Sequence, residues 1–197
     1  MKDKVMMIVV LVAVSMVSAL MLAGINAFSY DTIKMNKERK FKVAVLSALE
    51  IPFGSEGPEK IFSEKVKEVN TAAGSVYLTT DESGKGAAFS VKGSGFWGPI
   101  IVMVGVDPAK LTIKGIEILQ QEETPGLGAR IEEEWFREQF KGKRMDAPIG
   151  MMIKGAKPGT NDVVAVAGAT LSSRFMESII NEKSKPFIEA VRRLNLG

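Results

Sequence analysis

An uncharged apolar segment near the N-terminus is the feature that most constrains this chain. No charged residue occurs from Val5 to Tyr30. As an α-helix, Val5–Phe28 would be about 36 Å long at ~1.5 Å per residue, enough to cross a hydrocarbon core of ~30 Å. We therefore expect an uncleaved single-pass membrane anchor. The alternative is a cleaved signal peptide, but the run is long for one and Ile25–Ala27 is a poor cleavage site.

The orientation of this anchor is less well defined by the sequence. Lys2 and Lys4 precede the span, whereas more basic residues follow it between Lys34 and Lys42. Counting Lys and Arg alone would hold the C-terminal part inside the cell. Long domains are translocated largely regardless of such charges, so the count is weak for this chain.

The composition excludes several kinds of chemistry. The 197 residues include no cysteine and no histidine. Disulfides, thiolate metal sites, Fe–S ligation by cysteine, Ser-His-Asp triads and His-ligated zinc or haem are therefore excluded. We expect no metal site. The net charge of +3 comes from interspersed acidic and basic residues, so we also expect no nucleic-acid partner.

The remaining pattern predicts one α+β domain, with an antiparallel-rich sheet flanked by helices. A helix over 33–50 continues from the anchor and is broken by Ile51–Gly54. Pro58 opens a second helix, whose expected buried stripe is Ile61, Phe62, Val66 and Val69. Strands are expected at Val76–Thr79, Ala87–Val91, Ile100–Val106, Leu111–Leu119 and Val163–Val166, with a hairpin turn at Asp81–Gly86, a helix at Ile131–Lys141 and another after Ala169. We expect an anchor over 1–30, a helical connection over 31–70 and the domain over 71–197.

Three clusters that contain glycine stand out. Gly93–Ile100 places glycines around Phe96 and Trp97, which indicates a tight backbone path beside a flat surface. Glu122–Gly128 contains Pro125-Gly126, which suits a type II turn, and leaves Leu127 between two glycines. Each cluster, taken alone, is better explained as an ordinary structural loop, with Trp97 filling the core in the first and a strand-to-helix connection in the second.

The third cluster, Val163–Ser173, runs from a short strand through small residues into a helix. The hydroxyls of Thr170, Ser172 and Ser173 lie at the expected helix start. A helix N-terminus of this kind favours a bound phosphate, through its free N–H groups and its dipole. The alternative is that Thr170 or Ser172 caps the helix itself.

Together, and behind a membrane anchor, these clusters resemble the covalent FMN-binding domain of redox-driven ion pumps. That family includes the G subunit of the Rnf complex (ferredoxin:NAD oxidoreductase) and the C subunit of the sodium-translocating NADH:quinone reductase. The resemblance covers about residues 70–185. It rests on Gly95-Phe96-Trp97-Gly98-Pro99, Glu123-Thr124-Pro125-Gly126-Leu127-Gly128 and Gly168-Ala169-Thr170 with Ser172. Ala167 departs from the family, which usually has Ser or Thr there.

The resemblance implies that Thr170 carries FMN through a phosphoester. A separate flavin transferase would use FAD and Mg²⁺ to attach it and release AMP. Gly168 and Ala169 would leave space for the phosphate. By the same resemblance the candidate cofactor-binding residues are Trp97 and Leu127 at the ring face, Glu123 and Thr124 at its polar edge, Lys154 near N1 and O2, Gly126 and Gly128 in the turn, and Leu171, Ser172 and Ser173 at the helix start. For Lys154, a solvated surface lysine is an equally good interpretation.

The function implied is that of an electron-transfer subunit of a membrane-bound Na⁺- or H⁺-translocating complex, with no catalytic acid or base of its own. The short chain favours the G subunit of Rnf over the C subunit of the quinone reductase. Other membrane and peripheral subunits would be its partners. The implied location is the cytoplasmic membrane, with the FMN domain on the outer face. A membrane-anchored flavin redox sensor and a scaffold without flavin are the alternatives.

Overall fold

A single helix, α1 (Lys2–Ala48), contains the whole apolar N-terminal segment. The computed structural model describes residues 2–80, 85–153 and 155–194, and the chain divides into two units between Arg39 and Lys40. In the first unit the large apolar side chains from Val5 to Met35 are exposed. Among the described residues, α1 is the one helix that is long and apolar enough to cross a membrane, with a mean hydropathy of 2.8 over its best window.

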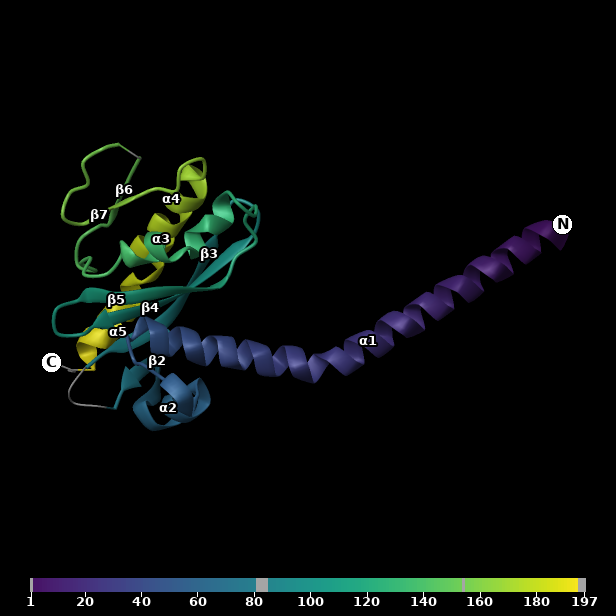
Figure 1. Ribbon diagram of the computed structural model, residues 1–197, viewed down its shortest axis with the longest axis horizontal. Helices are drawn as coiled ribbons and strands as arrows, with labels where there is room; N and C mark the ends of the chain where they lie inside the picture. Colours follow the sequence, from purple (N-terminus) through teal and green to yellow (C-terminus); the bar gives the residue numbers. More distant parts are fainter. Residues whose placement is uncertain (1, 81–84, 154, 195–197) are drawn as a thin grey trace. The chain divides into compact units, whose positions relative to one another are not determined.

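The second unit is built on one five-stranded antiparallel sheet whose strand order follows the chain order. Strands β2 to β5 are labelled in Figure 1. Each strand pairs with the next, as expected for a meander. The register between β4 and β5 shifts twice, at Ile101/Val102 and at Gly105/Val106, and each shift leaves one extra residue in β5. The strands are β1 (Val66–Thr71), β2 (Gly74–Thr79), β3 (Ala87–Ser94), β4 (Pro99–Asp107) and β5 (Thr112–Gln120).

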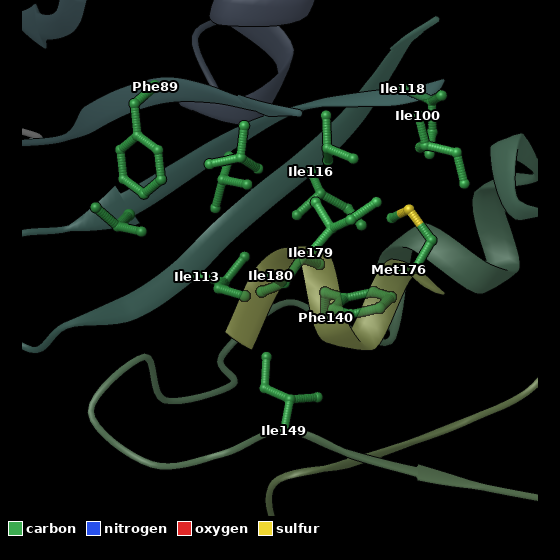
Figure 2. Close-up of a cluster of buried hydrophobic side chains, with 14 of the residues drawn as sticks. Phe89, Ile100, Ile113, Ile116, Ile118, Phe140, Ile149, Met176, Ile179 and Ile180 are labelled. Atoms are coloured by element: carbon green, nitrogen blue, oxygen red, sulfur yellow. The ribbon is translucent and has the colours of Figure 1, made fainter. Parts of the chain in front are cut away.

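Side-chain alternation divides the sheet into two buried faces. On one face, Tyr77, Ala88 and Met103 pack against the C-terminal turns of α1 and against α2 (Pro58–Lys65). On the other face, Phe89 and its neighbours pack against the C-terminal helices, with Met176, Ile179 and Ile180 at the contact (Figure 2). These helices are α3 (Glu134–Glu138), α4 (Thr170–Ser178) and α5 (Lys185–Arg193), and a π-helical turn, η4 (Ile179–Lys183), joins the last two.

The predicted antiparallel strands and the helix that begins after Ala169 are confirmed. The prediction that the helix from Pro58 includes Val66 and Val69 is wrong. α2 ends at Lys65, and Val66 and Val69 lie in β1, opposite Thr79 and Val76 of β2. These β-branched residues fit a paired strand better than a helix.

The predicted helix over 131–141 is also wrong in its extent. The chain forms a 3₁₀ turn, η3 (Gly128–Glu132), and then the short helix α3, because Glu133 between them is extended at φ −65° and ψ 141°. The strand expected at Val163–Val166 is β7 (Asp162–Val164), paired in parallel with the unpredicted β6 (Gly150–Met152). Positions 81–84 of the expected hairpin turn lie outside the described residues. The boundaries predicted at residues 30 and 70 stay predictions.

Candidate functional site

The three glycine-containing clusters meet around one hollow of about 390 Å³. They come from the β3–β4 loop, from the segment after β5 and from the start of α4. The sheet brings the first two together, because β3, β4 and β5 are neighbours. The lining residues are Phe96, Trp97, Glu123, Thr124, Leu127, Gly128, Gly168, Ala169, Thr170, Leu171 and Ser172.

The β3–β4 loop forms the aromatic side of the hollow. Ser94 and Pro99 are the last paired residues, and the Gly95 N–H donates to the Gly98 carbonyl oxygen at 2.8 Å. This tight turn leaves Phe96 and Trp97 53% and 67% exposed, with their rings edge to face at 5.2 Å. Two large aromatic side chains in solvent are unusual in a monomer and indicate a binding surface.

The segment after β5 forms the predicted turn. The Leu127 N–H donates to the Thr124 carbonyl oxygen at 3.1 Å, and Gly126 has the positive φ of 75° that a type II turn requires. Leu127 is 49% exposed at the hollow. The expectation of an exposed apolar side chain between two glycines is therefore confirmed.

The start of α4 forms the third side. Gly168 has a φ of 80°, which turns the chain away from β7, and Ala169 precedes the helix. Among the described residues, no side chain caps the first turn of α4. The alternative that Thr170 or Ser172 is the N-cap is wrong, because the Ser172 hydroxyl donates instead to Glu123 Oε2 at 2.6 Å. The first N–H groups of the helix thus stay available to an anion beside Thr170.

Glu123 is a buried carboxylate at the junction of the three segments. Its side chain is 4% exposed. Its Oε1 accepts hydrogen bonds from the N–H groups of Phe96 at 2.6 Å and Trp97 at 3.3 Å, and its Oε2 accepts the bond from Ser172. Charged hydrogen bonds of this kind are about twice as strong as neutral ones.

Other charged groups near this region pair with one another. Arg130, in η3 directly after the turn, binds Glu133 Oε1 at 3.0 Å. This hydrogen bond, together with one from Trp135, lowers the pKa of the Glu133 carboxyl. Both groups lie outside the lining, so the aromatic and hydroxyl-bearing residues dominate the hollow itself.

Most of the predicted site residues line the hollow, two do not, and one lies outside the described residues. Gly126 lies in the turn but outside the lining. Ser173 is fully buried, and its hydroxyl donates to the Ala169 carbonyl oxygen and accepts from the Val166 N–H. Lys154 lies outside the described residues. Phe96 lines the hollow and was not among the predicted site residues, although its place beside Trp97 between glycines was a usable signal. Among the described residues, no cluster of three or more acidic side chains that could hold a metal ion is found.

Comparison with known proteins finds similarity in both sequence and fold. Residues 95–185 match the FMN-binding domain family. The chain is 35% identical over 127 residues, 62% of its length, to the G subunit of the Na(+)-translocating ferredoxin:NAD(+) oxidoreductase complex of Acetobacterium woodii. It is also 35% identical over 160 residues, 77% of its length, to the C subunit of the Na(+)-translocating NADH-quinone reductase of Vibrio anguillarum. The chain spans 59% and 57% of the length of these two relatives.

Solved structures agree on the fold. The crystal structure of Shewanella oneidensis NqrC superposes with a TM-score of 0.71 at 21% identity, covering 81% of this chain and 99% of that one. The corresponding quinone-reductase protein from Parabacteroides distasonis gives a TM-score of 0.69 at 23% identity, covering 81% and 95%. Residues 95–185 thus resemble the FMN-binding domain family in sequence, the chain has the fold of NqrC, and its relatives include the G subunit of the ferredoxin:NAD(+) oxidoreductase complex and the C subunit of NADH-quinone reductases.

Proposed function

We propose that this protein is a membrane-anchored electron-transfer subunit of an ion-translocating oxidoreductase complex, and that it carries FMN covalently on Thr170. The observation that carries the proposal is the hollow itself. It joins Trp97, Leu127 and the uncapped start of α4 around the one threonine that the flavin motif singles out.

The described residues fit an FMN group. The hollow of about 390 Å³ lies within the usual range of ~300–1,000 Å³ for small-molecule sites. Trp97, Leu127 and Leu171 expose apolar surface that would cover the flat ring. Thr124 supplies a hydroxyl at the same rim. Bound there, FMN would accept electrons from one redox centre and pass them to another.

The start of α4 would hold the phosphate. The helix dipole and its free N–H groups stabilise negative charge there. In the attachment reaction, a bond forms between Thr170 Oγ and the FMN phosphorus of FAD. The pyrophosphate bond breaks, AMP leaves, and the hydroxyl proton is released. The partner in this step would be a flavin transferase with Mg²⁺. Ser172 and Ser173 would stabilise the helix start rather than take part, since their hydroxyls are already hydrogen bonded.

The apolar part of α1 supports the anchor. Its exposed side chains suit a lipid environment, and the rest of the chain would stand at the membrane as the FMN-carrying unit. We propose the cytoplasmic membrane, with this unit on the outer face. We propose an Rnf-type complex as the first choice for the host and the quinone reductase as the second; the two relatives reported above are equally identical to the chain and keep both open.

The test of attachment is an intact mass of the chain co-expressed with a flavin transferase. The wild type should gain the mass of FMN less one water and should fluoresce in a denaturing gel. Thr170→Val should show neither, whereas Thr124→Val, which alters the same rim, should be modified normally. An unmodified wild type, with the transferase active on another substrate, would refute the proposal.

The test of the host complex is purification of its assembly from native membranes. Ferredoxin-dependent reduction of NAD would identify the Rnf type, and quinone-dependent oxidation of NADH the other. Thr170→Val should leave the complex assembled but unable to transfer electrons. Loss of assembly in this variant would instead favour a scaffold.

A further inference from the structure

We propose that Glu123 is the positioning residue that assembles the flavin hollow, and that Gly95 and Gly128 serve this carboxylate rather than the cofactor. The inference rests on the proposed function for the identity of the ligand, but its contacts lie within the protein. The motif alone suggested that Glu123 meets the polar edge of the flavin. The structure assigns both of its oxygens to donors of the chain itself.

The carboxylate connects segments that are far apart in the sequence. Oε1 accepts from the N–H groups of Phe96 and Trp97, 27 and 26 residues away. Oε2 accepts from the Ser172 hydroxyl, 49 residues away. Two consecutive N–H groups that point at one oxygen form an anion-binding concavity, and here a side chain of the protein occupies it. One side chain thus fixes the aromatic loop against the first turn of α4.

The glycines beside Glu123 leave room for it. A Cβ on Gly95 would lie 2.5 Å from Glu123 Oε1, and a Cβ on Gly128 would lie 2.7 Å from Oε2 and 2.5 Å from the Ser172 hydroxyl. Neither glycine has a positive φ in this structure. Space, and not backbone conformation, is therefore what these positions require. Gly126 is the contrast, since it has a φ of 75° and open space around it.

The backbone of Glu123 is held as well. Its N–H donates to Gln121 Oε1 at 2.6 Å, which fixes the chain where it leaves β5. The carboxylate is thus supported from its own segment and bonded to two others. If it is removed, the N–H groups of Phe96 and Trp97 lose their acceptor, and the Ser172 hydroxyl loses its partner. The aromatic side of the hollow would then move independently of Thr170.

The test is amide hydrogen exchange on the full chain in detergent, without flavin. Glu123→Ala should speed exchange at Phe96 and Trp97 by about tenfold or more, the scale of a hydrogen bond to a charged group. Glu123→Gln keeps one carbonyl oxygen and should restore much of the protection. Ser172→Ala should loosen the same loop from the opposite end. Glu132→Ala, which alters an exposed carboxylate of the neighbouring turn, should change none of these rates.

Gly128→Ala tests the same contact with a different substitution. It should speed exchange at the same amides, and combining it with Glu123→Ala should add little, because both act on one contact. Unchanged exchange at Phe96 and Trp97 in Glu123→Ala would overturn the inference. If that variant does not fold, unchanged exchange in both Ser172→Ala and Gly128→Ala would overturn it equally.

A final measurement separates this inference from the proposed function. With FMN attached, the visible circular dichroism of Glu123→Gln should match that of the wild type, whereas the signal of Glu123→Ala should weaken towards that of free flavin. A wild type that takes no flavin refutes the attachment and leaves the exchange result standing. A modified wild type whose flavin spectrum is the same in Glu123→Ala refutes the positioning role alone.

Discussion

Replacing Gly105 by alanine is expected to disturb the packing between α1 and the sheet severely. Gly105 in β4 and Gly115 in β5 lie directly opposite each other and beneath the last turn of α1. A Cβ on Gly105 would lie 2.5 Å from the Ala48 carbonyl carbon and closer still to its oxygen. These are backbone atoms, so they cannot rotate away as a side chain would. The helix or the strand must therefore move.

The magnitude follows from the two opposing effects. Overpacking of a core typically costs about 1–3 kcal/mol, and a clash with backbone belongs at the upper end. Alanine in the middle of a strand is more favourable than glycine by about 0.5–1 kcal/mol, which offsets part of this cost. The net loss in the free energy of unfolding is about 2 kcal/mol or more, which lowers Tm by roughly 4–8 °C in a domain of this size.

Gly115 provides the matched control. A Cβ there would lie 3.2 Å from the Ala48 carbonyl oxygen and 3.3 Å from its Cα, which calls for only a small adjustment. We expect Gly115→Ala to change Tm by less than half as much. Thermal unfolding of the full chain in detergent, followed by tryptophan fluorescence, measures both. Equal shifts for the two variants, or no shift for Gly105→Ala, would show that the close approach of α1 is not what constrains this position.

Three further predictions follow from contacts elsewhere in the chain. Burial raises the pKa of the Glu117 carboxyl from 4.5, although the positive charge of Arg137 opposes this shift. The folded state therefore keeps this proton to higher pH than the unfolded state does, and the free energy of unfolding falls as pH rises above 4.5. Glu117→Gln should therefore gain in Tm relative to the wild type as pH rises above 4.5, and a difference independent of pH would contradict this. Asn181 bonds both the N–H and the carbonyl of Ile149, so Asn181→Ala should lower the free energy of unfolding by about 1–3 kcal/mol in a urea titration, and an unchanged midpoint would count against it. Because the chain has no native cysteine, Ala109→Cys should react with an impermeant thiol reagent in intact cells and Asp3→Cys should not, whereas the reverse pattern would place the FMN unit inside.

The sequence predicted the strands from β2 to β5 because local signals agreed there. Apolar residues alternate, as at Ile116 and Ile118 around Glu117, and turn residues separate the runs. The same reasoning failed at Val66 and Val69, whose spacing of three fits one face of a helix, whereas in the observed strand the two side chains lie on opposite faces. Pairing with β2 decides between helix and strand, and that is a tertiary effect. No local signal predicted β6 (Gly150–Met152), a three-residue strand that depends on its partner β7.

For the candidate site, the sequence identified the segments better than the individual contacts. The three clusters do meet, and Trp97, Leu127, Gly168 and Thr170 line one hollow. The sequence could not show that Glu123 is buried and already bonded, because acidic residues are usually exposed. It also could not show that the Ser173 hydroxyl is used within the chain. Hydroxyls at a helix start are as often structural as ligand-binding, and only the packing of Val166 and Ala169 around Ser173 separates the two.

The meander of the sheet affects how the protein folds while it is being synthesised. Each strand pairs with the one synthesised just before it, so the sheet can form early from local contacts as the chain emerges. Met176, Ile179 and Ile180, which cover one face of that sheet, come from residues beyond 170 and arrive last. Chains truncated ahead of α4 would thus leave an apolar sheet face uncovered, and we expect them to aggregate during biosynthesis.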